Sequence, residues 1–320
     1  MDKPLFLPKE LAPGDGAARP STYAELFAFA VEAAYRKGVF VANPAPPVRK
    51  TCLVNGMSLN YLDWESNGQP PMLLLHGALL QAHVWDFFSL DMRQHFHIRA
   101  VDLPGHGDSG WAPDGDYSRV RGCAHVVALI QQLDLSELVL VGHSFGGAVA
   151  ALAAAQLRER IRALVIVDST LQATGRPSVR IRSAAGPQMF PSFEDFVQHA
   201  ATLGRRGDAE RLRTSLYWNA RQLPDGMWTW KYDPALRQGP LGPGNFEDIW
   251  SALRAFPGPV LFIRAGEYSH LTDDAAERLQ GMPNVRLVVV PEAAHNVMSD
   301  NPLAFRDTVA AFVSSLAPTS

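Results

Sequence analysis

A serine lies between glycines in the stretch GHSFGG at residues 142–147, directly after the apolar run LSELVLV. A strand that passes through such a turn into a helix is typical of the G-x-S-x-G nucleophile elbow. The serine of an elbow takes a strained backbone conformation, so its close neighbours must be small. An ordinary tight turn with an incidental serine is the alternative. The strand–turn–helix context favours Ser144 as a nucleophile.

A serine hydroxyl needs a base that removes its proton. His295, in PEAAHNVMSDNP, follows the last apolar run and precedes the last helical segment, so we predict that it is the general base. His76, His106 and His143 are interpreted as structural or loop-shaping residues, and His143 is also a tentative pocket residue.

The negative oxygen that forms during acyl transfer needs donors that are already in place. The backbone N–H of Phe145, at the start of the helix after the serine, is one predicted donor. The second is expected from HGALL, most simply the N–H of Ala78.

The elements that must position these residues alternate along the chain. Apolar runs that read as strands occupy 72–77, 97–105, 137–144, 163–169, 259–266 and 285–295, and helical segments include 117–133, 146–157, 273–280 and 302–316. This alternation predicts an α/β fold with a mostly parallel sheet covered by helices on both faces. Sites in such sheets form at the carboxyl ends of the strands, where the polar residues of this chain gather. Asn55-Gly56 predicts a hairpin before the parallel strands.

Two further segments flank the expected core of residues 51–169 and 250–320. Residues 1–50 form an N-terminal extension with one amphipathic helix, for which Thr22 and Glu25 have capping-box spacing. That helix is expected to pack on the main domain. The alternatives are a contact between copies of the chain in a homo-oligomer and a helix that lies on a membrane surface. Residues 170–249 show helical stretches and no convincing strand, which predicts a helical cap inserted after strand six.

The composition of the chain argues against several classes of binding partner. The net charge is −3 and no dense Lys/Arg cluster appears, so nucleic acid is not an expected partner. Cys52 and Cys123 fit no metal or disulfide pattern, which suits the cytoplasm. No signal peptide and no membrane span is recognised, so no integral membrane contact is expected.

Four motifs together resemble the α/β-hydrolase superfamily: HGALLQAHVW, DLPGHGDS, GHSFGG and PEAAHNVMSDNP, in that order. The resemblance covers residues 51–320. It implies the α/β-hydrolase fold, with the cap after strand six, and a Ser-His-acid triad. Haloalkane dehalogenases and epoxide hydrolases of this superfamily carry Asp at the centre of the elbow, so Ser144 argues against both chemistries.

The acid of the triad departs from the common family pattern. Many members carry it in a G-x-x-D turn after the seventh strand, where this chain has Ser269. Asp168, at the end of the sixth strand, resembles the acid of a subgroup whose later turn reads R-x-G-x-x-S-x-L; here that turn has Arg264, Gly266, Ser269 and Leu271. We assign the acid to Asp168, with Glu267 as the alternative acid.

The resemblance implies a serine esterase that hydrolyses small-molecule carboxylic esters through an acyl-enzyme on Ser144, with no metal and no organic cofactor. The alternatives are a lactonase or a carbon–carbon bond hydrolase with the same triad, or a ligand-binding α/β-hydrolase with slow turnover. The cap aromatics Trp218, Trp228 and Trp230 are tentative substrate-pocket residues together with His143, and the core of the cap is the alternative place for each tryptophan.

Overall fold

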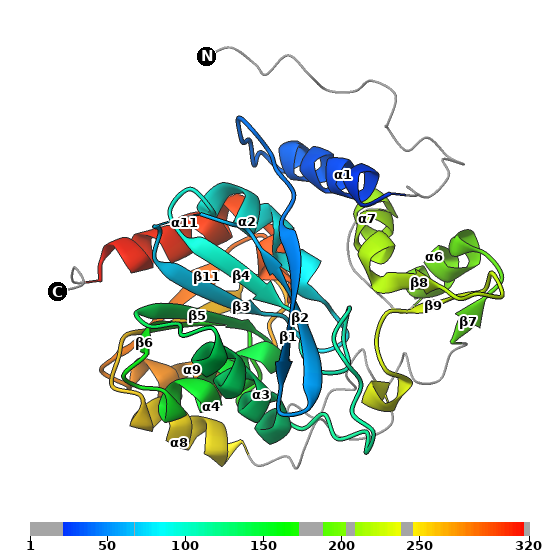
Figure 1. Cartoon of the computed structure of the whole chain (residues 1–320). Helices are drawn as coiled ribbons and strands as arrows, with labels where there is room; N and C mark the ends of the chain where they lie inside the picture. Colours follow the sequence, from blue (N-terminus) through cyan, green and yellow to red (C-terminus); the bar gives the residue numbers. More distant parts are fainter. Residues whose placement is uncertain (1–21, 67, 173–187, 203–208, 238–245, 317–320) are drawn as a thin grey trace.

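An eight-stranded sheet forms the centre of the molecule (Figure 1). The structure is a computed structural model that describes residues 22–66, 68–172, 188–202, 209–237 and 246–316. In spatial order the strands are β1 (Val48–Val54), β2 (Met57–Asp63), β4 (His97–Val101), β3 (Pro71–Leu75), β5 (Leu138–His143), β6 (Ile161–Val167), β10 (Val260–Ala265) and β11 (Val285–Val290). β2 is antiparallel to both of its neighbours, β1 and β4, and all the other pairs of neighbouring strands are parallel. The predicted fold class is confirmed.

The central strands are apolar throughout because both faces of the sheet are covered. Successive side chains of a strand point to opposite faces. Leu73 and Leu75 of β3 therefore join one apolar cluster, while Met72 and Leu74 join the other. The continuous apolar runs in the sequence follow from this double burial.

The two faces carry different helices. One face is covered by α3 (Arg119–Gln132), α4 (Phe145–Gln156), α8 (Glu247–Ala255) and α9 (Asp273–Gln280). The other is covered by α1 (Tyr23–Arg36), the 3-10 helix η1 (Ala82–Trp85), α2 (Asp86–Met92), α10 (Val297–Asp300) and α11 (Pro302–Ser314). Among the described residues, no helix is long and apolar enough to cross a membrane.

The helix α1 lies between the sheet domain and the region predicted as a cap (Figure 1). It starts with the expected capping box, in which Thr22 and Glu25 bond each other's backbone N–H. Phe27 packs in the cluster over the sheet, and Phe29 packs against Tyr217 of the cap. The buried side chains of α1 are therefore covered within the chain, by the sheet domain on one side and by the cap on the other.

The cap is defined here as residues 188–202 and 209–237. Its elements are β7 (Met189–Phe190), α6 (Phe193–Thr202), α7 (Ala209–Asn219), β8 (Ala220–Gln222), β9 (Trp228–Trp230) and the 3-10 helix η2 (Pro234–Arg237). The expected helices are present, but the expectation of no strand is wrong, because β7, β9 and β8 form a small antiparallel sheet. Strands of two or three residues are too short to show an alternating pattern.

The boundaries of the predicted segments differ from the observed elements at two places. β1 starts at Val48, within the predicted extension, and α8 starts at Glu247, within the predicted insertion, although it packs with α4. Residues 1–21 of the extension and residues 173–187, 203–208 and 238–245 of the insertion lie outside the described residues. The division into extension, core and cap stays a proposal.

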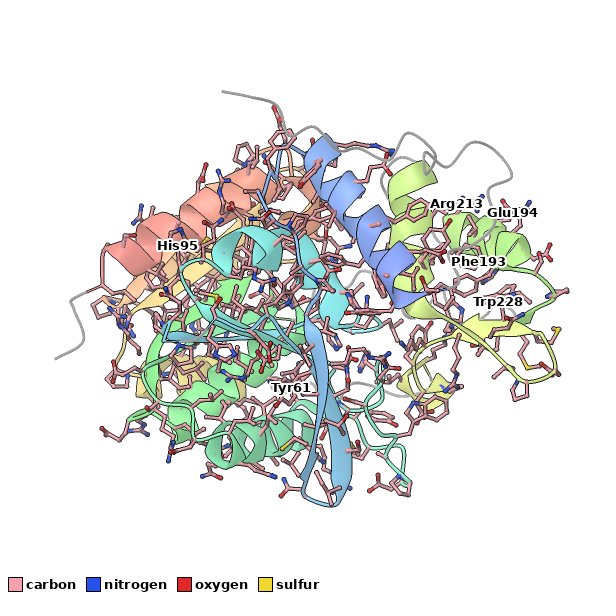
Figure 2. The ribbon with its side chains drawn as sticks, turned by 45° about the horizontal axis from the view of Figure 1, so that its top comes forward. Tyr61, His95, Phe193, Glu194, Arg213 and Trp228 are labelled. Atoms are coloured by element: carbon pink, nitrogen blue, oxygen red, sulfur yellow. The ribbon has the colours of Figure 1, made fainter. Side chains whose placement is uncertain are left out.

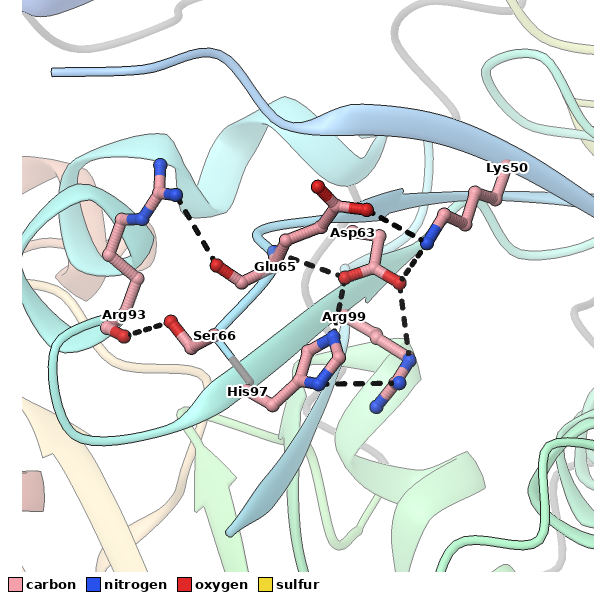
Figure 3. Close-up of polar contacts among 7 residues, drawn as sticks. All are labelled: Lys50, Asp63, Glu65, Ser66, Arg93, His97 and Arg99. Carbon is pink, nitrogen blue, oxygen red and sulfur yellow. Dashed lines mark hydrogen bonds and ion pairs between the residues drawn. The ribbon is translucent and has the colours of Figure 1, made fainter. Parts of the chain in front are cut away.

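An ion cluster ties β1, β2 and β4 together at the end of β2 (Figure 3). The Asp63 carboxylate is buried and accepts from Nε2 of His97 at 2.6 Å and from Nζ of Lys50 at 3.0 Å. Burial alone would raise the pKa of Asp63, but His97, Lys50 and Arg99 outweigh it and lower that pKa. Asp63 pairs with Arg99 near the start of β4, so the cluster lies at the end of the sheet opposite Ser144.

Candidate active site

Ser144 joins β5 to α4 in a strained turn. Its φ of 52° and ψ of −115° are unusual for a residue with a side chain. The turn is tight, since a Cβ on Gly142 would lie 2.3 Å from the carbonyl oxygen of Gly146. The Ser144 N–H donates to the carbonyl of Val167 at 2.9 Å, and the Ser169 hydroxyl donates to the carbonyl of Ser144 at 2.7 Å. These bonds hold the serine at the carboxyl end of the central strands.

The structure brings Ser144, His295 and Asp168 into one chain of hydrogen bonds. His295 Nε2 lies 3.0 Å from Ser144 Oγ, and His295 Nδ1 lies 2.7 Å from Asp168 Oδ2. With the proton on Nδ1 donated to Asp168, Nε2 is free to accept the serine proton. The arrangement can therefore activate the hydroxyl and stabilise the imidazolium that results.

The Asp168 carboxylate is completely buried and fully bonded. Its Oδ1 accepts from the N–H of Ala265 at 3.1 Å and from the Ser269 hydroxyl, and its Oδ2 also accepts from the N–H of His270 at 3.1 Å. Burial alone would raise the pKa of Asp168, but His295, Ser269 and Ala265 outweigh it and lower that pKa. Ser269, at the position where many family members carry the acid, thus donates to the candidate acid at the end of the neighbouring strand.

Glu267 lies in the same turn as Ser269 but is exposed. Its N–H donates to the carbonyl of Ala293 at 2.9 Å. The Nδ1 atom of His295 is bonded to Asp168. Of the two carboxylates weighed from the sequence, Asp168 is the one that the structure places against the histidine.

Two more histidines surround His295. The ring of His270 stacks on it at a centroid distance of 3.7 Å, with 19° between the planes. His143 is completely buried and its Nε2 donates to the His295 carbonyl at 2.8 Å. Burial and the nearby charge of His295 hold the pKa of His143 well below its usual range. No part of His143 is exposed and its described bond supports His295, so its place in a substrate pocket stays a prediction.

The predicted oxyanion donors face no competing acceptor. No described residue accepts a hydrogen bond from the N–H of Phe145 or from that of Ala78. Phe145 begins α4 immediately after Ser144, and Ala78 follows Gly77, whose added Cβ would lie 3.1 Å from the Cβ of Ser144. Both segments therefore lie beside the serine, as an oxyanion hole requires.

The structure places the three tryptophans proposed for the pocket in two different surroundings. Trp228 packs on Phe193 at 5.4 Å and Trp230 packs on Phe196 at 4.5 Å, inside the cap. Figure 2 shows Phe193 and Trp228 together in the cap, apart from the central sheet. Their described contacts are those of a cap core, which is the alternative to a pocket lining. Trp218 instead stacks on His83 of η1, at 3.6 Å and 8° between the planes.

Ser169 and His270 were missed from the sequence. Ser169 directly follows the candidate acid Asp168, and His270 directly follows Ser269. This closeness in the sequence is the one feature that could have pointed to a role for them at the site. Nothing in the local pattern shows that His270 stacks on a residue 25 positions later.

The described residues contain no group of three or more His, Cys, Asp or Glu that could hold a metal ion. Cys52 and Cys123 are both buried free thiols.

A cavity of about 430 Å³ borders the elbow on the side of α3. Its walls come from the β1–β2 hairpin, the segment before α3 and the start of α3, and include Met57, Trp111, Tyr117 and Phe145. Phe145 thus has its ring in a cavity wall while its N–H lies beside Ser144.

Comparison with known proteins finds the same fold and a related sequence. The sequence model of the alpha/beta hydrolase family matches residues 72–308. Esterase Rv0045c of Mycobacterium tuberculosis is 31% identical over 292 residues, which cover 88% of this chain and 94% of the esterase. A solved structure of that esterase has a TM-score of 0.73 at 28% identity and covers 91% of this chain and 99% of its own. N-formylmaleamate deformylase of Pseudomonas putida is 29% identical over 250 residues, which cover 77% of this chain and 89% of the deformylase.

Proposed function

Because the chain belongs to the alpha/beta hydrolase family, we propose that it is a serine esterase that cleaves small-molecule carboxylic esters through an acyl-enzyme on Ser144. The observation that carries the proposal is the continuous bonding from Ser144 through His295 to the buried Asp168. The similarity to the M. tuberculosis esterase over most of both chains supports an ester as the substrate.

In the first half of the reaction, His295 Nε2 takes the proton of Ser144 and Oγ attacks the ester carbonyl carbon. The carbonyl oxygen becomes an oxyanion that accepts from the N–H groups of Phe145 and Ala78. The negative Asp168 stabilises the imidazolium while it exists. The tetrahedral intermediate then collapses, the C–O bond breaks, and Nε2–H protonates the leaving alkoxide.

In the second half, water attacks the acyl carbon and gives its proton to His295 Nε2. The second tetrahedral intermediate collapses, Ser144 Oγ leaves and recovers its proton, and the carboxylic acid is released. The strained elbow and the bonds from Val167 and Ser169 keep Oγ in place through both halves. The proposal needs no metal and no organic cofactor.

The substitution Ser144→Ala tests the proposal. We expect it to abolish labelling by a fluorophosphonate probe and to lower ester turnover by roughly 10⁴–10⁶-fold, with an unchanged melting temperature. Ser136→Ala, which changes an exposed serine before β5, is the matched control and is expected to leave labelling and turnover intact. Turnover in Ser144→Ala similar to that of the wild type would refute the mechanism.

A substrate panel tests the bond that is cleaved. It contains p-nitrophenyl esters, a lactone, an N-formyl amide and a vinylogous 1,5-diketone, at equal concentrations. We expect the highest kcat/KM with an ester. A higher value with the lactone or the diketone would instead assign lactonase or carbon–carbon hydrolase activity to the same triad. Labelling of Ser144 without turnover of any member would indicate a slow, ligand-binding hydrolase.

A further inference from the structure

We propose that the cap holds the oxyanion hole in its working geometry through His106, which makes His106 a positioning residue for the reaction. The proposal rests on the proposed function, because it concerns the donor Ala78 of that mechanism. Two segments are involved. The oxyanion loop is defined as residues 76–81, after β3, and the β4 loop is defined as residues 102–110.

The oxyanion loop is closed by a turn in which the N–H of Leu80 donates to the carbonyl of Gly77 at 3.2 Å, but one of its peptide units is held from outside the loop. Leu79, next to the donor Ala78, has a φ of 60°, which costs free energy for a residue with a branched side chain. The N–H of Leu79 donates to Nε2 of His106 at 3.1 Å, in a buried contact. This bond fixes the peptide unit that follows Ala78, and it comes from the β4 loop.

Two other side-chain bonds tie this segment to the β4 loop, one within the oxyanion loop and one at the first residue of η1. The N–H of Leu103 donates to His76 Nε2 at 2.9 Å, and the carboxylate of Asp102 accepts from the N–H of Ala82 at 2.7 Å. Asp102 also accepts from the N–H of Asp108 at 2.9 Å, so the β4 loop is closed on itself. The oxyanion loop therefore follows the position of the β4 loop.

His106 is suited to a permanent acceptor role. Its ring is 1% exposed, and Nδ1 donates to the carbonyl of Pro104 at 2.9 Å, which leaves Nε2 without a proton. Burial, and next the charge of His76, lower the pKa of His106 to about 3. The imidazole therefore stays neutral at working pH, and Nε2 remains able to accept the hydrogen bond.

The cap holds the β4 loop by its backbone. The N–H of Gly107 donates to the carbonyl of Lys231 at 2.9 Å and the N–H of Asp233 donates to the carbonyl of Gly105 at 2.8 Å, so His106 and Tyr232 face each other in an antiparallel bridge. Nζ of Lys231 adds a bond of 2.8 Å to Asp108. The residue that supports Leu79 is thus the residue that pairs with the cap.

A second contact reaches the element that follows the oxyanion loop. Trp218 of α7 stacks on His83 of η1, and Tyr23 of α1 packs on both rings. The His83 ring is also held by the buried Asp86, at 2.9 Å. The cap therefore contacts both sides of the segment that carries Ala78. A shift of the cap is transmitted to the position of the Ala78 N–H.

Matched variants of His106 separate positioning from folding. His106→Leu removes the acceptor for Leu79, whereas the amide oxygen of His106→Gln replaces Nε2; both lose the bond to Pro104. For each variant we measure kcat and KM with p-nitrophenyl butyrate. We also measure inhibition by an alkyl trifluoromethyl ketone, which Ser144 converts to an oxyanion, and by the corresponding carbinol, which cannot form one.

For His106→Leu we expect kcat and ketone affinity to fall by about 10–100-fold, less than the loss of an entire donor, with KM and carbinol affinity within about twofold. His106→Gln is expected to retain most of both. Equal losses of ketone and carbinol affinity, or equal damage in the two variants, would overturn the proposal. If the wild-type enzyme does not turn over esters, the proposed esterase function itself is refuted. If the wild type is fully active and His106→Leu is equally active, only the positioning role of His106 is refuted.

The contribution of the cap is tested by a double-mutant cycle with Lys231→Met, which breaks the ion pair from the cap to Asp108 and leaves the one from Arg49. We expect a selective loss of ketone affinity of about threefold in the wild-type background and almost none when His106 is already Leu. Equal effects in the two backgrounds would show that the cap does not act through His106. If His106→Leu does not fold, Lys231→Met decides: a loss of ketone affinity without a loss of carbinol affinity supports the proposal, and equal losses refute it.

Discussion

The substitution Asp168→Asn is expected to disable the site while it preserves the shape of the residue. The carboxylate accepts four hydrogen bonds, from Ala265, Ser269, His270 and His295. An amide offers one oxygen and one NH₂ group, so half of these donors must face another donor. With NH₂ toward His295, Nδ1 has to accept, the imidazole proton moves to Nε2, and the base can no longer take the proton of Ser144.

With the oxygen toward His295, the tautomer survives but the charge that stabilises the imidazolium is lost. The NH₂ group then faces the N–H of Ala265 and the Ser269 hydroxyl, which is able to rotate and accept. We therefore expect kcat to fall by roughly 10³–10⁴-fold near neutral pH, in line with the same change in a serine-protease triad. This fall corresponds to about 4–5.5 kcal/mol of lost transition-state stabilisation.

The assay is the steady-state hydrolysis of a p-nitrophenyl ester, with melting temperature as a check of folding. Glu267→Gln changes the exposed carboxylate of the neighbouring turn and is the matched control, expected within about tenfold of wild type. Adding Ser269→Asp to Asp168→Asn returns a carboxylate to the common family position and is expected to restore part of kcat. A crippled Glu267→Gln beside a normal Asp168→Asn would refute the assignment of the acid.

Two further predictions concern stability. Because the pKa of Asp63 is lowered in the folded state, its contribution to stability is complete above the ordinary value of 3.8 and is lost as pH falls through the lower folded value. The gap in melting temperature between wild type and Asp63→Asn should therefore narrow as the pH is lowered from 7 to 3, and a constant gap would contradict this linkage. Phe29→Ala removes a buried ring between α1 and the cap and is expected to lower the free energy of unfolding, measured in urea, by about 3 kcal/mol. Phe40→Ala, at a ring that is 64% exposed, is expected to change it by about 0.5 kcal/mol or less, and equal losses in the two variants would contradict the packing role of Phe29.

Features that depend on residues close together in the chain could be predicted from the sequence. The elbow needs small residues beside the serine within a few positions, the hairpin needs Asn55-Gly56 between its strands, and the capping box of α1 needs Thr22 and Glu25 three residues apart. The double burial of the sheet makes its strands continuously apolar, which reveals the α/β architecture without any knowledge of contacts. His295 could be placed after the last strand because the order of motifs along the chain is itself local information.

Other features depend on contacts between residues that are far apart in the chain. His295 and Asp168 are 127 positions apart, so the sequence left Glu267 as an alternative acid, and the register of β6 beside β10 places Asp168 where Ser269 and His295 meet it. The cap sheet was missed because strands of two or three residues are stabilised by their partners and not by a pattern of their own. The bond from Leu79 to His106 and the bridge from His106 to the cap are likewise set by the packing of loops, which no local propensity encodes. Local patterns were enough to propose the nucleophile and the base, whereas the choice between the two carboxylates and the contacts that hold these groups depend on packing between distant segments.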